Sequence, residues 1–394
     1  MIEGKDEAAG TGSLTCGMIG GGQGAFIGDV HRKALAMDRG AVLAAGCFSQ
    51  DFKNTRQTGR LLGLKEDRLY NTYSDMLESE AQRKDGMDFV IIVTPNHTHF
   101  PIAEMALEKG FHVVCDKPLT TNGRDAQRLA DLAKKRDLLF CVTYAYAGYP
   151  MVKHIRDIVA RGDLGKIRFV HAEYPQDWLA TPLEKSGQKQ SLWRTDPARA
   201  GLSNCVGDIG SHIENMVASM TGLRIHSLCA RLDIFGEDRV LDDNASILVN
   251  YEGGAKGVYW SSQIAVGNDN GFRVRIYGTR ASVDWNQEQP NYCRMGFVDK
   301  PTEILSRGRD ALTPSAARHI RIPSGHPEGY FEAFANIYNT FTGALGKKKA
   351  DEPLSPEDLD FPDVREGVRG VRYIEACVES SKKGSAWVEL TGTN

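Results

Sequence analysis

The sequence CGMIGGGQGAFIGDVHRKAL, from Cys16 to Leu35, places a run of glycines between an apolar stretch and a helical pattern. Glycine is costly in a regular element, so such a run indicates a backbone that bends sharply or is approached closely. The flanking patterns predict a strand over residues 14–20 and a helix over residues 30–37. Gly20 and Gly22 therefore begin the fingerprint of a dinucleotide-binding turn, in which a pyrophosphate lies at a helix N-terminus.

The third small residue of this fingerprint has two candidates. Ala25 satisfies G-x-G-x-x-G/A directly, whereas Gly28 fits a loop that is three residues longer. Both alternatives keep Gly20 and Gly22 on the phosphates. The turn residues expected to bind the cofactor are Gly20, Gly22, Gln23, Gly24, Ala25, Phe26 and Ile27.

Short apolar runs alternate with helical patterns as far as about residue 142. Strands are expected at residues 14–20, 41–48, 87–95, 111–118 and 138–144, with helices at 75–83, 99–110 and 123–136. This alternation predicts a parallel sheet with helices on both faces. Residues 14–145 are therefore expected to form an α/β Rossmann domain with a doubly wound parallel sheet.

The alternation of strands and helices ends after residue 146. A helix near residues 151–162 precedes β-rich segments at 166–174, 225–236, 245–254, 255–266 and 272–285, and Gly253-Gly254 indicates a hairpin. Consecutive strands predict a mostly antiparallel sheet, so residues 146–394 are expected to form an α+β domain. Residues 184–191 and about 301–325 are predicted to be surface loops, and the polar residues 1–13 a disordered tail.

Composition limits the classes of partner. The 394 residues suit two domains, and a net charge of -3 gives no reason to expect nucleic acid or an anionic membrane. No apolar run reaches the ~18 residues of a membrane span, and the first thirteen residues lack the pattern of a secretory signal. The eight scattered cysteines predict buried free thiols, with no metal site. A cytoplasmic protein that acts on metabolites is expected.

The end of the second strand bears on the choice of cofactor. An acidic residue usually binds the adenosine ribose there, but this strand ends in Ser49-Gln50-Asp51, with Lys53 and Arg56 behind it. Asp51 suits the ribose diol of NAD, whereas the serine and the cations would tolerate the 2′-phosphate of NADP. NAD is the first expectation and NADP remains open.

Two further strand ends carry polar residues, and ligands bind at such ends. The Thr94-Pro95-Asn96 turn is expected beneath the nicotinamide ribose, with His97 and His99 nearby. Asp116-Lys117-Pro118 follows the next strand. Lys117 is either a solvated charge or the group that hydrogen-bonds the reacting hydroxyl and favours its alkoxide.

The densest polar segment is WRTDPARAGLSNCVGDIGSHIENM, from Trp193 to Met216. Asp208 and His212 are four residues apart and share one face if residues 207–220 are helical. A carboxylate beside an imidazole fixes its tautomer or raises its pKa, which would make His212 a general base. The alternative is a pair that only caps the helix. No spacing indicates a metal site.

Four segments in this order, MIGGGQGAFIGDVHRKAL, VTPNHTHFPIAEMALEKGFHVVCDKPL, WRTDPARAG and DIGSHIENM, resemble the glucose-fructose oxidoreductase / inositol dehydrogenase / MocA family over essentially the whole chain. The resemblance implies a large open sheet in the second domain, whose outer face commonly mediates dimers or tetramers. Lys117 corresponds to the family's E-K-P lysine, and Asp208 and His212 to its D-x-x-x-H pair. Three positions depart from the family pattern, namely Asp116 for glutamate, Ser49 for an acid and Asn215 for aspartate.

The implied reaction is the NAD(P)-dependent oxidation of a ring secondary alcohol, with His212 as base, Lys117 stabilising the alkoxide and Asp208 orienting. Similarity of the glycine loop and of GHPEGYFEAFAN to one subgroup favours a glucoside 3-dehydrogenase that forms the 3-keto sugar. The alternatives are an inositol dehydrogenase and, from another class, a cofactor-binding sensor or a redox-neutral glycoside-cleaving relative. The other residues implied at the cofactor are Ser49, Gln50, Lys53, Thr94, Pro95, Asn96, His99, Asp116, Lys117, Trp193 and Arg194. Those implied at the substrate are Lys117, Tyr146, Asp177, Trp178, Asn204, Asp208 and His212.

Overall fold

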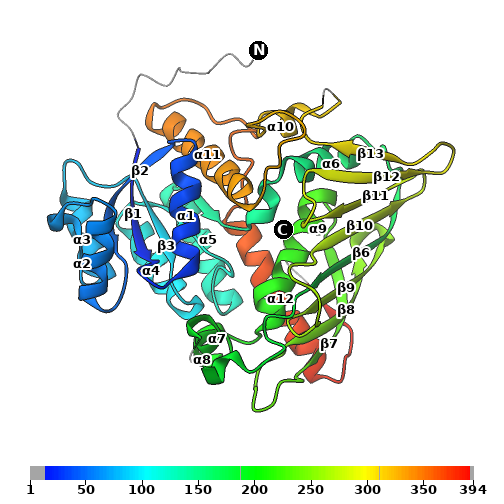
Figure 1. Cartoon of the computed structure of the whole chain (residues 1–394), viewed down its shortest axis with the longest axis horizontal. Helices are drawn as coiled ribbons and strands as arrows, with labels where there is room; N and C mark the ends of the chain where they lie inside the picture. Colours follow the sequence, from blue (N-terminus) through cyan, green and yellow to red (C-terminus); the bar gives the residue numbers. More distant parts are fainter. Residues whose placement is uncertain (1–13, 187, 310, 391–394) are drawn as a thin grey trace.

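The first sheet lies at the left of Figure 1 and is parallel, in the order β2-β1-β3-β4-β5. The computed structural model describes residues 14–186, 188–309 and 311–390, so the predicted tail at residues 1–13 lies outside the described part. The strands are β1 (Leu14–Gly20), β2 (Ala41–Cys47), β3 (Phe89–Val93), β4 (His112–Cys115) and β5 (Phe140–Val142). The predicted doubly wound parallel sheet is confirmed.

Helices cover this sheet. They are α1 (Phe26–Met37), α2 (Phe52–Leu61), α3 (Tyr73–Gln82), α4 (His99–Glu108) and α5 (Gly123–Arg136), with short 3₁₀ turns at η1 (Glu66–Arg68) and η2 (Asn96–Thr98). The sequence patterns missed α2 because its buried positions are Thr55, Thr58 and Gly59, which give no apolar period.

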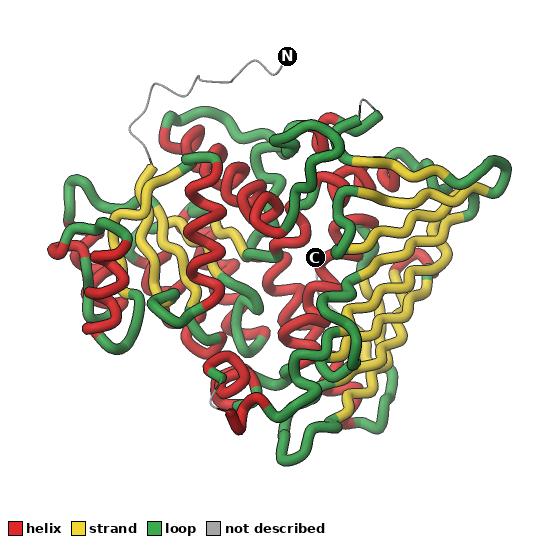
Figure 2. Tube along the Cα trace, viewed as in Figure 1, coloured by secondary structure: helices red, strands yellow, loops and turns green. Residues whose placement is uncertain are grey.

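The second sheet has nine strands in the order β13-β12-β11-β10-β6-β9-β8-β7-β14 (Figures 1 and 2). β6 and β9 pair in parallel, and the other neighbours pair antiparallel, as predicted for most of the sheet. The strands are β6 (Ile167–Pro175), β7 (Ile225–Asp233), β8 (Asn244–Tyr251), β9 (Lys256–Ser262), β10 (Arg273–Gly278), β11 (Ala281–Asn286), β12 (Tyr292–Phe297), β13 (Glu303–Ser306) and β14 (Val388–Glu389). The predicted hairpin at Gly253-Gly254 joins β8 to β9, and both glycines have positive φ.

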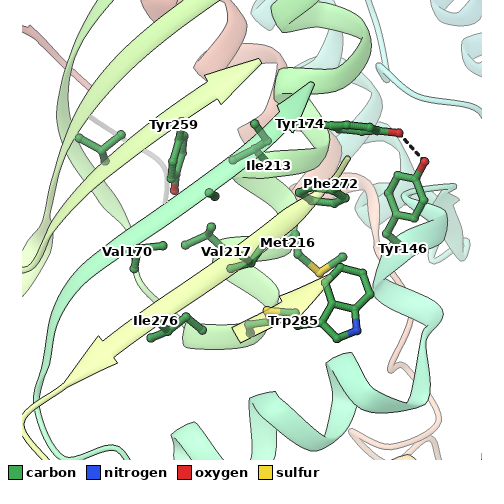
Figure 3. Packing of buried hydrophobic residues seen from close by; sticks show 14 of the residues in the cluster. Tyr146, Val170, Tyr174, Ile213, Met216, Val217, Tyr259, Phe272, Ile276 and Trp285 are labelled. Carbon is green, nitrogen blue, oxygen red and sulfur yellow. Dashed lines mark hydrogen bonds between the residues drawn. The ribbon is translucent and has the colours of Figure 1, made fainter. Parts of the chain in front are cut away.

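The remaining helices lie mainly between the two sheets (Figure 1). They are η3 (Ala145–Gly148), α6 (Pro150–Ala160), η4 (Leu183–Ser186), α7 (Lys189–Arg194), α8 (Pro197–Ala200), the π-helical turn η5 (Val206–Gly210), α9 (Ser211–Thr221), η6 (Glu252–Gly254), α10 (Pro314–Ala317), α11 (Tyr330–Lys349) and α12 (Val364–Lys382). α9 lays Ile213, Met216 and Val217 on the inner face of the nine-stranded sheet, around Trp285 and Phe272 (Figure 3).

The chain end returns to the first sheet. Phe334 and Phe341 of α11 belong to the core that contains β1 and β3, and Val368 and Val371 of α12 belong to the core on the other face. The predicted boundary near residue 145 stays a prediction. Because α11 and α12 pack on the first sheet, they fix how the two sheets face each other. The boundary between the two halves of the chain, called the seam below, contains the candidate site.

Two predicted loops are corrected. Residues 184–191 contain part of η4 and the start of α7, and Ser191 is fully buried. The tract 301–325 contains β13 and α10, and the buried Arg307 guanidinium donates to Glu328 at 2.8 Å. All eight cysteines are free, seven of them buried, as predicted. Among the described residues no helix is long and apolar enough to cross a membrane, and no group of metal-ligating side chains occurs.

Candidate active site

The glycine turn leads from β1 into α1 and is shaped for close approach. Gly20, Gly21 and Gly24 have positive φ, and a Cβ on Gly22 would lie 2.9 Å from the carbonyl oxygen of Phe48. A Cβ on Gly28 would collide with Gly21. Gly28 is therefore the packing glycine, while Ala25 is the N-cap residue of α1.

The start of α1 offers backbone donors to a ligand. No side chain caps this helix, so its first N–H groups have no side-chain acceptor. The Gly22 N–H donates to the Phe48 carbonyl at 3.0 Å, the Gln23 N–H to the Asn54 side chain at 3.1 Å and the Ala25 N–H to the Gly22 carbonyl at 3.0 Å, so the donors that face a ligand are those of the first turn of α1. Because Gln23, Gly24 and Phe26 are exposed, a dinucleotide pyrophosphate fits this position.

The end of β2 is arranged around a helix cap. The Asp51 carboxylate accepts from the Lys53 N–H at 2.9 Å and caps α2, and the Ser49 hydroxyl accepts from the Asp51 N–H at 3.1 Å. Arg56 is paired with Glu66. Gln50 and Lys53 are exposed beside them in the sequence.

The turn after β3 connects the two halves of the chain. Thr94 accepts from the Thr98 hydroxyl at 2.7 Å, and the Asn96 amide donates to Ala200 of α8 at 2.9 Å, with Pro95 between them. His99 is fully buried, and its ring nitrogens lie 2.9 Å from the Pro118 carbonyl and 2.8 Å from that of Thr94. This corrects the expectation that His99 contacts the cofactor, because both nitrogens already bind the protein backbone.

Lys117 follows β4 and reaches across the seam to Asp208. Its Nζ donates to the Asp208 Oδ1 at 2.7 Å and to the Asp208 carbonyl at 2.5 Å. Both side chains are 12% exposed, so the pair is largely shielded from water. The neighbouring Asp116 accepts from the Lys117 N–H and from the Thr143 hydroxyl, which fixes the backbone from which Lys117 extends.

Asp208 is surrounded by donors. Arg194 of α7 forms an ion pair with its Oδ1, and Gln263 donates to its Oδ2 at 3.0 Å. Burial alone would raise the pKa of Asp208, but Arg194 and Lys117 outweigh it and hold that pKa well below its usual value. The Arg194 guanidinium also lies over the half-buried Trp193 ring, at 4.7 Å. Lys117, Arg194 and Asp208 together carry one net positive charge.

His212 lies in the first turn of α9 and is surrounded by tyrosines. Its ring centroid lies 4.7 Å from that of Tyr146, 5.7 Å from Tyr144 and 6.2 Å from Tyr174. Burial first, and then the Lys117 charge, lower the pKa of His212 well below its usual value. Asp208 does act to raise this pKa, as one of the two predicted alternatives had it, but burial and the charges of Lys117 and Arg194 outweigh that contribution. No hydrogen bond joins Asp208 to His212 in the described structure, since Lys117, Arg194 and Gln263 occupy the carboxylate.

Most of the other predicted substrate residues come from η3 and from the segment that follows β6. The Tyr146 hydroxyl lies 2.5 Å from that of Tyr174, as Figure 3 shows, and Tyr174 donates to Asn270 at 2.7 Å. Asp177 and Trp178 are half-buried on the segment after β6, where Asp177 accepts from the Gly267 N–H.

Asn204 is corrected as a substrate contact. It is 2% exposed and its amide donates to Gln263 at 2.7 Å. The position of Asn215, where the family has an aspartate, is also buried, and the adjacent Glu214 is paired with Arg369 of α12 at 2.6 Å. Neither Asn204 nor Asn215 is exposed enough to contact a ligand.

Gln263 is the main site residue that sequence reasoning missed. It follows the alternating apolar positions of β9, where a polar residue at a strand end was an available signal.

Comparisons with known proteins agree with this geometry. The family model described as "Oxidoreductase family, NAD-binding Rossmann fold" matches residues 14–144, and that of the GFO/IDH/MocA C-terminal domain matches residues 152–284. The chain is 37% identical to the uncharacterized oxidoreductase YfiI of Bacillus subtilis, covering 96% of this chain and 97% of that protein. A levoglucosan dehydrogenase of Pseudarthrobacter phenanthrenivorans is 27% identical over 53% of this chain and 58% of its own. The crystal structure of an inositol dehydrogenase homolog from Azotobacter vinelandii, complexed with NADH and myo-inositol, superposes with a TM-score of 0.89 at 37% identity, covering 96% and 97% of the two chains.

Proposed function

Because the chain belongs to the GFO/IDH/MocA family of NAD-dependent oxidoreductases, we propose that it oxidises the C3 hydroxyl of a glucose unit, free or in an O- or C-glycoside, to the 3-keto sugar. The observation that carries the proposal is the buried Lys117–Asp208 pair beside His212. NAD, when bound, accepts the hydride from the substrate carbon. The residues of this chain bind the sugar and move its proton.

Lys117 is suited to stabilise an alkoxide. An ammonium has three N–H donors, and two of them go to Asp208, which leaves one for a substrate oxygen. The positive charge that remains after Lys117 and Arg194 share one carboxylate favours negative charge on that oxygen. Asp208 fixes the direction of the Lys117 ammonium through two hydrogen bonds.

His212 is suited to accept the hydroxyl proton. Its lowered pKa keeps the imidazole neutral at physiological pH, which is the form that a base requires. The edges and faces of Tyr146 and Tyr174 around it give an apolar wall with hydroxyl groups, which suits a six-membered ring polyol.

A second candidate substrate is myo-inositol. The relative of known structure named above was solved with NADH and myo-inositol, and the catalytic residues required are the same. The levoglucosan dehydrogenase relative acts on a sugar and supports the first candidate.

Purified protein incubated with NAD or NADP and a panel of glucose, O- and C-glucosides and inositols decides between them. NADH formation with glucosides and a 3-keto product supports the proposal, whereas turnover of inositols alone selects the second candidate. If no member of the panel leads to reduction of NAD or NADP, that result would contradict both candidates and favour a sensor or a redox-neutral relative.

We also propose that two or more copies associate through the outer face of the nine-stranded sheet. That face exposes Phe169 beside its cross-strand partner Tyr277, and Leu248 is 48% exposed two strands away from Phe169. Exposed apolar side chains among ion pairs on an uncovered sheet suit a homo-oligomeric interface (Figures 1 and 2). The cytoplasmic location stays a prediction.

A further inference from the structure

Gln263 lies directly behind the catalytic pair and is completely buried. Its N–H donates to the Asp243 carbonyl at 2.9 Å, and its own carbonyl accepts from the Leu179 N–H at 2.9 Å. Hydrogen bonds on both sides of the backbone fix the point from which the side chain extends. The amide is therefore held toward Asp208 by the sheet end itself.

The orientation of the Gln263 amide follows from its two neighbours. An ionised carboxylate only accepts hydrogen bonds, so the group 3.0 Å from the Asp208 Oδ2 is the Gln263 Nε2. The Gln263 Oε1 then faces Asn204, whose Nδ2 donates to it at 2.7 Å. Both amide groups have one allowed orientation because Asp208 is charged.

Asn204 is anchored in turn by a buried carboxylate. Asp242 is 4% exposed and accepts from the Asn204 N–H at 3.0 Å, the Val206 N–H at 3.0 Å and the Ser203 hydroxyl at 2.9 Å. These bonds hold the turn that enters the π-helical segment containing Asp208. A continuous hydrogen-bonded chain therefore runs from Asp242 through Asn204 and Gln263 to Asp208.

We propose that Gln263 is a positioning residue for the oxidation, which holds the Oδ2 of Asp208 so that its Oδ1 stays directed at Lys117. This inference rests on the proposed function. The two oxygens of Asp208 have separate partners, with Gln263 on one and the cations Lys117 and Arg194 on the other. Without the amide, the Asp208 Oδ2 would lose this donor and the carboxylate would be held through its Oδ1 alone, so the third N–H of Lys117 would be directed less closely.

A neutral amide suits this position for a physical reason. It donates to the carboxylate without adding a third cation, and it neither gains nor loses a proton in the working pH range. Asp208 therefore stays ionised and keeps its hydrogen bond to Lys117 while the alkoxide forms.

The Gln263→Glu variant tests this role through its pH profile. A protonated glutamic acid donates to Asp208 as the amide does, whereas an ionised one places two carboxylates together, which raises the pKa of the pair. We expect turnover to be retained at low pH and to fall about 10-fold or more as the pH rises through that pKa. Gln263→Leu, which has no donor, should lower kcat about 10- to 100-fold at every pH without a change in KM for NAD.

Gln287→Glu is the matched control. Gln287 is also buried, accepts from an asparagine amide at 3.0 Å and donates to the Tyr149 hydroxyl, but it does not touch Asp208. Gln287→Glu buries a carboxyl group, as Gln263→Glu does, but that group does not face Asp208. The proposal is overturned if Gln263→Glu keeps the wild-type pH profile, or if Gln287→Glu gains the same alkaline decrease.

A measurement without turnover separates this inference from the proposed function. Burial and the facing Asp208 both raise the pKa of the new glutamate, so Gln263→Glu loses stability as the pH rises, and Asp208→Asn in the same chain removes the facing charge and should reduce that loss. Equal alkaline losses of Tm in the single and double variants would overturn the contact between 263 and 208. If the wild type oxidises no substrate, the proposed function fails, and this stability comparison still decides whether Gln263 acts on Asp208.

Discussion

Replacing Lys117 by methionine removes the ammonium and keeps most of the side-chain volume. Removing one preorganised donor from a developing oxyanion typically costs about 10²- to 10³-fold in kcat, or ~2.7–4 kcal/mol. The site argues for the lower end of that range, because Arg194 remains on Asp208 and retains positive charge nearby. We expect kcat to fall about 10²-fold.

The same variant should move the acid limb of the pH profile. In the wild type the oxidation rate falls on acidification only as the pH drops through the lowered pKa of His212, because the base must be neutral. The Lys117 charge is the second cause of that lowering, after burial. Lys117→Met should therefore raise the pKa of His212 and shift the acid limb toward higher pH.

NADH formation measured across the pH range, with saturating NAD and the best substrate of the panel, tests both effects. Lys153→Met is the matched control, because Lys153 is 4% exposed and shares Asp360 with Arg156 and Arg318, away from the active site. The free energy of unfolding should fall in both variants by less than the ~3–5 kcal/mol that an unpaired buried charge costs, since each carboxylate keeps other partners. Near-normal kcat in Lys117→Met, or an acid limb that moves to lower pH, would refute the reasoning.

Three further predictions follow from the fold. Gly28→Ala should weaken NADH binding about 10-fold or more, because the new Cβ would displace Gly21 beneath the phosphate turn. Fluorescence titration with NADH measures this affinity, and an unchanged affinity would contradict the prediction. Asp51→Ala should lower stability by ~1 kcal/mol through loss of the α2 cap and leave the ratio of NAD to NADP activity unchanged; a large change in that ratio would mean that Asp51 binds the ribose instead. Leu248→Arg should lower the oligomeric mass measured by light scattering, and an unchanged mass would exclude this part of the sheet as the interface.

The first domain was predictable because its signals are local. Leu14–Gly20 is the strand that the apolar run predicts, and the sharp turn expected of the glycines is formed with positive φ at Gly20, Gly21 and Gly24. α2 was not predictable from apolar periodicity, since threonines and a glycine form its buried face. The predictions for the two loops failed because the regular segments in them are short, four to six residues each, and so give no clear period.

The candidate site was predictable only in part. Lys117, Asp208 and His212 carry motif signals, and the structure brings them together across the seam. Their partners depend on tertiary contacts: Gln263 comes from a strand end 55 residues beyond Asp208, and no local pattern links the two. The direction of the His212 pKa could not be predicted either, because it depends on burial by tyrosines from η3 and β6.

The most direct test of the central claim uses methyl glucoside that carries deuterium at C3, incubated with NAD and the purified protein. The proposed function predicts that the deuterium appears in the reduced cofactor, that the 3-keto glucoside forms in equal amount, and that turnover is slower than with the unlabelled sugar. Reduced cofactor without label, with the deuterium still on the sugar, would contradict oxidation at C3. No reduction of NAD by glucosides, with turnover of inositols, would assign the site to the cyclitol instead.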